Sequence, residues 1–275
     1  MYNKFNDLAK RSPINRGLCV CFEEEVGFSL AIIEKNKISY ACRVIFGSSK
    51  IEDQLKESMS FFETKKELLN GAFDNVVVCF SNMKYILVPS YFYNFEEEEE
   101  LLHFNTYLLT GDTIKRNYIN NYQSYLIFSY QEKFEEFIKK KYNNITTLHS
   151  LGAFLSSKEA HVDKTVIYVM FYFKQFELIL LEGEKLILSN TFEYTGKKDV
   201  LYYILLIIER LGYKDKDFDV FLEGKIDIKD ELYLFLARYI KNIKIINCKF
   251  GIKSNFSKEF NFLFNLFQCA LYQEN

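Results

Sequence analysis

One order of apolar segments and polar turns occurs twice in this chain, and this repetition constrains the fold more than any other feature. The polar turns at 34–37 and 182–185 are 148 residues apart, and the segments around them follow in the same order. The first copy predicts strands at 18–22, 27–34 and 38–46, a helix at 51–69 and a buried strand at 76–80. The second copy predicts strands at 165–172, 175–181 and 186–194, a helix at 197–211 and a buried strand at 218–222. A duplicated β-β-β-α-β unit is the simplest explanation.

Each copy is followed by further elements, which complete two lobes. After the first copy, the pattern predicts strands at 85–88, 122–128 and 145–148 and helices at 95–109 and 131–141. After the second, it predicts helices at 229–239 and 258–272 and a strand at 243–246. We therefore expect an N-terminal tail over 1–16, a first lobe over 17–160 and a second lobe over 161–275. The boundary at 160–164 lacks the Pro, Gly and Ser of a free linker, so the lobes are expected to pack together.

Composition and charge restrict the class of partner. The net charge of −2 provides no basic field, so nucleic acid is not expected as a partner. The longest apolar run, 200–208, is about half of a membrane span, and no signal-peptide pattern is present. The six cysteines form no regular framework, which is typical of reduced thiols and predicts a cytoplasmic location. The 28 Phe and 20 Tyr residues are expected mainly in the core.

Motifs that carry catalysis or bind metals are not found. Cys19 and Cys21 share one face of a predicted strand, but no second cysteine pair or histidine cluster accompanies them. The sequence contains no G-x-S-x-G, H-E-x-x-H or P-loop motif. We therefore predict no catalytic residue and no metal ligand.

Two facing β-β-β-α-β-α lobes resemble the ribonuclease-H-like halves of the actin-like ATPase superfold. The expected fold class is therefore α/β, with two such lobes in an actin-like ATPase arrangement. The resemblance implies that ATP binds between the halves and that the first β-hairpin of each half holds phosphate. Glycine lets the backbone approach the phosphate oxygens there, small hydroxyl side chains donate to them, and a carboxylate positions Mg²⁺.

In the first lobe, the matching hairpin turn departs from this pattern. It contains Glu23, Glu24 and Glu25, and only Gly27 remains as a small residue. Three adjacent carboxylates are expected to repel a polyphosphate.

The second lobe departs from the pattern at two places. Its hairpin turn contains Phe173, Lys174 and Gln175, without glycine, acid or small hydroxyl side chain. The adenosine-binding position keeps one glycine, Gly224, where the superfold has a pair. We therefore expect that ATP hydrolysis has been lost and that no cofactor is bound.

The whole chain also resembles a Bacteroidetes family known as domain of unknown function 3822. The resemblance rests on 76–89, where a buried strand, Ser81-Asn82 and Ile86-Leu87-Val88-Pro89 follow one another, and on the acidic motif that starts at Phe95. The family label implies no activity.

Three functions are compatible with these features of the sequence. The favoured one is a non-catalytic pseudo-ATPase that binds a protein partner, in the interlobe cleft or at a sheet edge, with a groove near 88–95 for an extended peptide. Its fold-level analogues are pilus and secretion assembly proteins. The alternative is an enzyme or sensor that binds a nucleotide or another small ligand in the cleft, with Glu23, Glu25, Lys174 and Gly224 as lining. The third is a homodimer with Phe-rich faces.

The acidic run 96–100 has two interpretations. Asn94 and the acids after it favour a solvated helix start. Together with Glu23–Glu25, the run could instead form an acidic dock for a basic partner.

Overall fold

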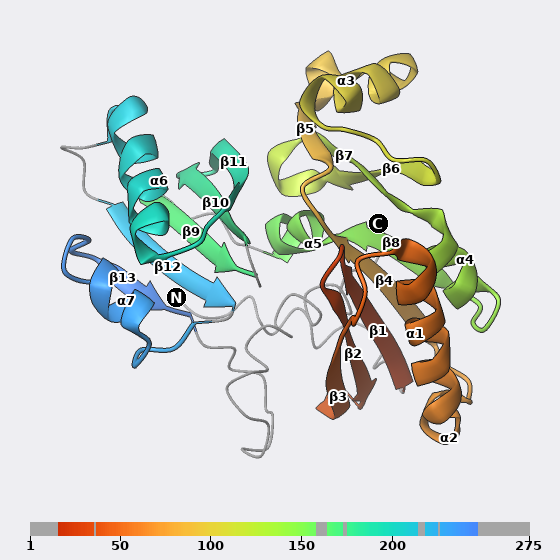
Figure 1. Cartoon of the computed structure of the whole chain (residues 1–275). Helices are drawn as coiled ribbons and strands as arrows, with labels where there is room; N and C mark the ends of the chain where they lie inside the picture. The colour runs from red at the N-terminus through yellow and green to blue at the C-terminus, as the bar shows by residue number, and fades with distance from the viewer. Residues whose placement is uncertain are drawn as a thin grey trace.

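The computed structural model describes residues 16–35, 37–157, 164–172, 175–213, 218–224 and 226–246. They form two lobes side by side, each built on a five-stranded sheet, and a smaller three-stranded sheet lies above the first lobe (Figure 1). The first described residue, Arg16, already belongs to a strand. The predicted lobe boundary at 160/161 and the helix at 258–272 lie outside the described residues. No helix in the described part of the chain is long and apolar enough to cross a membrane.

The first lobe has the sheet order β3-β2-β1-β4-β8. Its strands are β1 (Arg16–Glu23), β2 (Gly27–Glu34), β3 (Lys37–Ile45), β4 (Asn75–Ser81) and β8 (Ile145–His149). Helices α1 (Ile51–Thr64), α2 (Lys66–Leu69) and α4 (Glu132–Lys139) accompany it, and α5 (Ser150–Ser157) follows β8. Phe22 on β1 packs against Phe134 of α4, with ring centroids 4.6 Å apart. Many of the phenylalanines therefore fill the core, as the sequence predicts.

The second lobe repeats this sheet as β11-β10-β9-β12-β13. Its strands are β9 (Thr165–Phe171), β10 (Gln175–Glu182), β11 (Lys185–Glu193), β12 (Phe218–Gly224) and β13 (Ile243–Ile245). Its helices are α6 (Lys197–Arg210) and α7 (Glu231–Leu236). In both sheets the first strand is antiparallel to the second and parallel to the fourth.

The duplication extends to an irregularity of the backbone. The second and third strands shift register between Ile32 and Ile33 in one lobe and between Leu180 and Leu181 in the other. These bulges are separated by the same 148 residues as the two polar turns. The predicted duplicated unit is therefore confirmed in its detail.

Of the two lobes, as far as their residues are described, only the first carries an inserted subdomain, between β4 and α4. It consists of β5 (Tyr85–Pro89), α3 (Glu98–Asn105), β6 (Asp112–Ile119) and β7 (Ser124–Gln131), with the sheet order β5-β7-β6. Short 3-10 helices cover Ser90–Phe92, Phe95–Glu97 and Asn120–Tyr122. The helix predicted at 95–109 is therefore too long, and β6 was not predicted. The α3 helix ends at Asn105 because the next residue, Thr106, is extended.

The lobes are packed together. Helix α5 lies between the two large sheets (Figure 1), and Phe154 on this helix contacts Tyr168 of β9 edge-on at 5.3 Å. Both rings are buried in a hydrophobic cluster that includes residues of the two lobes. Burial of such a side chain contributes on the order of 2 kcal/mol, so α5 fixes one lobe against the other.

Candidate functional site

The three glutamates in the turn of the first-lobe hairpin differ in burial and in their contacts. Glu23, at the end of β1, is buried and forms an ion pair with Arg43 at 2.9 Å. The carboxylate of Glu24 accepts a hydrogen bond from the Lys84 ammonium. Glu25 is exposed at the apex, in the left-handed region with φ of 61°. Cations of the same lobe therefore contact Glu23 and Glu24, and the expected repulsion of a polyphosphate by the three carboxylates stays a prediction.

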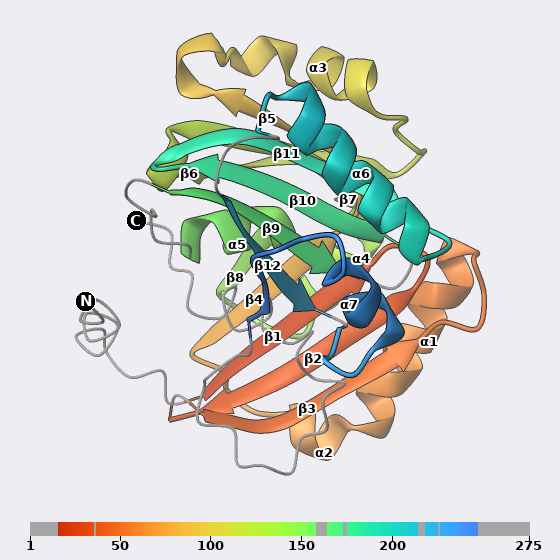
Figure 2. The same ribbon diagram turned by 90° about the vertical axis from the view of Figure 1, so that its left-hand side faces the viewer.

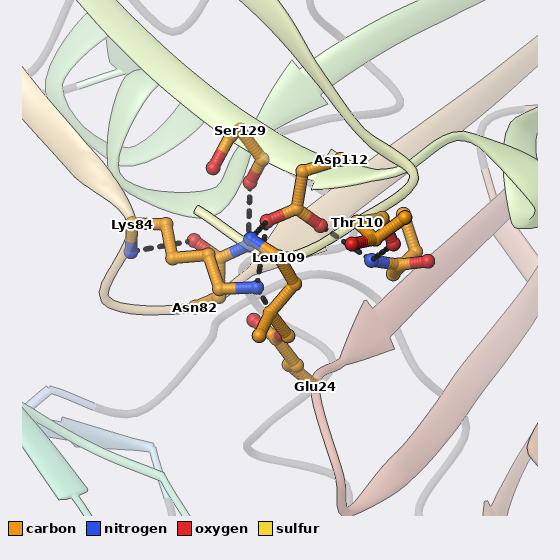
Figure 3. Close-up of polar contacts among 8 residues, drawn as sticks. Glu24, Asn82, Lys84, Leu109, Thr110, Asp112 and Ser129 are labelled. Atoms are coloured by element: carbon orange, nitrogen blue, oxygen red, sulfur yellow. Dashed lines mark hydrogen bonds and ion pairs between the residues drawn. The ribbon is translucent and has the colours of Figure 1, made fainter. Parts of the chain in front are cut away.

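A polar network extends from Glu24 into the inserted subdomain (Figure 3). Lys84 Nζ also contacts Asp112 Oδ2 at 3.0 Å. Asp112 accepts two further hydrogen bonds, from Gln131 Nε2 at 2.6 Å and from the Leu109 N–H at 2.9 Å. Burial raises the pKa of Glu24, and contact with Lys84 opposes that rise. Lys84 is therefore shared by two carboxylates of the protein.

The space beside this turn is small. Between the hairpin and Phe46, Phe80 and Phe134 there is a cavity of about 20 Å³. A cavity of this size holds about one water molecule. A phosphate group does not fit there.

Backbone packing within the sheets explains why Gly27 and Gly224 are glycines. A Cβ on Gly27 would lie 2.0 Å from the carbonyl oxygen of Val44. Gly224 has φ of +88°, and a Cβ there would lie 2.3 Å from the carbonyl oxygen of Phe171. Close backbone approach therefore requires glycine at both positions without any ligand.

In the second-lobe hairpin, Phe173 and Lys174 lie outside the described residues. Gln175 begins β10, and its carbonyl accepts a hydrogen bond from the Tyr172 N–H at 2.9 Å. Gln175 thus closes the hairpin through its backbone.

A buried carboxylate two residues further along was missed by sequence reasoning. Glu177 Oε1 accepts hydrogen bonds from the Tyr85 hydroxyl at 2.7 Å and from Ser189 Oγ at 3.3 Å. Tyr172 donates to the other oxygen at 3.3 Å. Burial raises the pKa of Glu177 to about 7. Because Tyr85 comes from β5 and the other three residues from the second lobe, this cluster connects the inserted subdomain to the second lobe. The signal was a single acid in the otherwise apolar segment 176–181.

A groove of about 930 Å³ lies between β5 and β11. Each of these strands is at the edge of its sheet, and both views place β11 beside the inserted subdomain (Figures 1 and 2). The hydroxyls of Tyr85 and Thr191, 3.0 Å apart, connect the two strands across one part of the groove. The groove follows Tyr85–Pro89, whereas the sequence placed it near 88–95.

The groove is lined mainly by apolar, amide and hydroxyl side chains. Among the described residues that line it, only Glu184 and Lys185 are charged, and they are adjacent to each other at the β10–β11 turn. Asn105, Asn121, Gln123 and Asn190 contribute amides, which can donate and accept hydrogen bonds. Such a lining suits an uncharged ligand better than a polyphosphate.

The inserted subdomain also exposes aromatic side chains. Tyr91 and Phe104 are 90% and 94% exposed, and Phe92, Phe95 and Tyr107 are exposed as well. A homodimer could bury this surface, so the predicted homodimer stays a prediction. Glu98 in the acidic run is buried and paired with Arg116 at 3.2 Å, so this run is not uniformly solvated.

The buried histidine of the first lobe has a structural role. His149 Nε2 lies 3.2 Å from the Asn82 carbonyl oxygen, and Nδ1 accepts from the Leu151 N–H at 3.2 Å. Burial lowers the pKa of His149 to about 4, so the ring is neutral at pH 7. Among the described residues, no three or more His, Cys, Asp or Glu side chains are grouped to hold a metal ion.

Comparison with known families gives one match over most of the chain. Residues 15–243 match the family described as protein of unknown function (DUF3822). No curated protein sequence matches the chain.

Solved structures share the fold at low sequence identity. A Bacteroides thetaiotaomicron protein with actin-like ATPase fold and unknown function is 17% identical, with a TM-score of 0.73, over 87% of this chain and 93% of that one. A chain of the PilM–PilN type IV pilus biogenesis complex is 11% identical, with a TM-score of 0.65, over 95% of this chain and 100% of that one. Ethanolamine utilization protein EutJ from Carboxydothermus hydrogenoformans is 10% identical, with a TM-score of 0.51, over 98% and 95% of the two chains. The expected actin-like ATPase fold is therefore confirmed.

Proposed function

This chain belongs to the family of proteins of unknown function DUF3822 and has an actin-like ATPase fold, and we propose that it is a non-catalytic scaffold that binds a partner protein. The observation that carries the proposal is the contrast between two spaces. The cavity beside the first-lobe hairpin has about 20 Å³, whereas the groove between β5 and β11 has about 930 Å³. Pockets that bind small ligands usually have about 300–1,000 Å³, so of these two spaces the groove is the one with room for a ligand.

The charges around the hairpin support a loss of nucleotide turnover. Phosphate sites require donors and cations that face the ligand. Here Lys84 is engaged by Glu24 and Asp112, and Arg43 is engaged by Glu23. A polyphosphate would have to displace these carboxylates and enlarge the cavity at the same time.

The groove supports a protein partner rather than a nucleotide. Its walls are two edge strands, and edge strands carry main-chain groups that can pair with another chain. The structural neighbour from the PilM–PilN complex belongs to a protein–protein assembly, which agrees with a binding role at the level of the fold.

The test is thermal unfolding with millimolar Mg-ATP, Mg-ADP or Mg-GTP, accompanied by calorimetric titration and an assay for released phosphate. A ligand at about 100 times its dissociation constant stabilises a protein by about 2.7 kcal/mol. We expect no shift, no binding heat and no phosphate release. A saturable shift would contradict the proposal and favour the alternative, an enzyme or sensor with a nucleotide in the cleft.

A further inference from the structure

Within the described residues, no strand pairs with the outer edge of β11, and alternate residues of β11 direct their main-chain groups to that edge. The Tyr172 N–H donates to the Gln175 carbonyl, so these two residues form a hydrogen-bonded pair that closes the β9–β10 hairpin. Because hydrogen-bonded pairs alternate along antiparallel strands, the odd-numbered residues of β10 hydrogen-bond to β9 and the even-numbered ones to β11. In β11 the even-numbered residues therefore pair with β10, and the main-chain groups of Ser189, Thr191 and Glu193 point to the free edge. The Thr191 N–H agrees with this assignment, because it donates to the side chain of Asn190 at 2.9 Å instead of to β10.

The opposite wall of the groove is less suited to pairing. The Ser90 N–H donates to the Gln123 carbonyl, so the even-numbered residues of this segment hydrogen-bond to β7. The main-chain groups of the residues between them, Tyr85, Leu87 and Pro89, therefore point away from β7. The Tyr85 carbonyl already accepts from Asn105 Nδ2 at 2.8 Å, and proline has no N–H. Both features are common means of protecting an edge strand. In β11, by contrast, Ser189 lies at the centre of a nine-residue edge strand.

The chemistry of the groove restricts what pairs with β11. The charged residues of its lining are confined to the β10–β11 turn, and the rest of the lining is apolar or carries amides and hydroxyls. Beyond the groove, a second hollow of about 320 Å³ lies beside Glu193, bordered by Tyr202 and Tyr203. Open space therefore lies along β11 from Lys185 to Thr191 and beside its last residue, Glu193.

We propose that β11 binds an extended, largely uncharged segment of the partner protein as an additional strand of the second-lobe sheet, inside the groove that β5 closes from the other side. This inference rests on the proposed function and names the form in which the partner binds. Main-chain hydrogen bonds to Ser189 and its neighbours would provide affinity, and the uncharged lining would select the side chains.

The experiment starts with a phage-displayed library of random peptides, selected against the whole protein. The selected peptides are then measured against three variants. S189P removes the central N–H of the free edge, and S189A removes only the hydroxyl. A41P is the matched control, because Ala41 occupies the same place on β3, 148 residues earlier.

We expect S189P to weaken binding roughly tenfold or more, the effect of losing at least one main-chain hydrogen bond, with S189A and A41P close to wild type.

N-methylation of the peptide provides a second measurement that requires no altered protein. Methyl groups at every second amide should abolish binding, and those at the amides between should not. Absence of any selected peptide, or binding that is insensitive to both S189P and N-methylation, would overturn the inference. Neither result would affect the nucleotide test, so a failure here is distinguishable from a failure of the proposed function.

Discussion

Strands β3 and β11 are two copies of one edge strand, and they differ in what lies opposite them. Both have nine residues, both pair with the preceding strand through the same bulge, and both direct odd-numbered residues to the free edge. In the described part of the chain, β11 faces the inserted subdomain across a large groove, and no such groove is found beside β3. The duplication therefore determines the fold, whereas the part that is not duplicated creates the candidate binding site.

The two lobes also differ at the end of the fourth strand, and this difference gives the largest expected effect. Gly224 stands there in the second lobe, and Ser81 occupies the corresponding place in the first. We expect G224A to destabilise the protein by more than about 3 kcal/mol, because the added Cβ meets the Phe171 carbonyl oxygen at 2.3 Å and φ is +88°. Urea unfolding measures the effect.

Gly183 serves as a control that separates the cost of backbone strain from the cost of a steric clash. Gly183 has φ of +61°, but no atom lies within 4 Å of the place of a Cβ. We expect G183A to cost only about 1 kcal/mol. An equal loss in both variants would show that Gly224 is not required by the close approach to Phe171.

The contact between Tyr85 and Glu177 connects the inserted subdomain to the second lobe, and its strength should depend on pH. Because burial raises the pKa of Glu177 to about 7 from its ordinary 4.5, the folded state holds the proton more tightly than the unfolded chain. This contribution is complete below about pH 4.5 and is lost as pH rises through about 7. Its size is on the order of 3 kcal/mol.

The variant E177Q tests the direction in which stability changes with pH. Its stability relative to wild type should increase between pH 5 and pH 8, and the pH dependence of His149 cancels because both proteins contain it. Unfolding free energies across this range measure the difference. A difference that is constant with pH would mean that Glu177 is charged in the folded protein throughout.

The first-lobe network should have a smaller effect on stability. We expect K84M to lose about 2 kcal/mol, because the side chain of Asp112 is buried but keeps the hydrogen bonds from Gln131 and Leu109. The control is K141M, whose ion pair with Glu63 is at the surface and should leave the urea midpoint unchanged. A urea midpoint for K84M as close to wild type as that of K141M would contradict this expectation.

The sequence predicted the parts of the molecule that are repeated or strongly patterned. The polar turns and the apolar strands β4 and β12 were placed correctly, because buried parallel strands form continuous apolar runs. Strand β6 was missed because Asp112–Ile119 mixes charged and apolar residues without alternation. Helix α5 was missed because Gly152 and several serines give a weak helical pattern, although Gly152 fits closely against Leu126.

The candidate site could not be predicted in the same way. The contact between Tyr85 and Glu177 joins residues 92 positions apart, and that between Lys84 and Glu24 joins residues 60 positions apart. Such pairs depend on how the inserted subdomain sits on the two lobes, and one sequence contains no signal for that. Sequence reasoning did identify the altered hairpin turn, but the cations that pair with its acids come from β3 and from the segment before β5.

The most direct test of the central claim is amide hydrogen exchange along β3 and β11, measured with a selected peptide and separately with Mg-ATP. We predict that the peptide slows exchange at Ser189 and leaves Ala41 unchanged, and that Mg-ATP slows exchange at neither strand nor at the turn 23–27. Protection of the turn by Mg-ATP, or protection of β3 and β11 alike by the peptide, would contradict it.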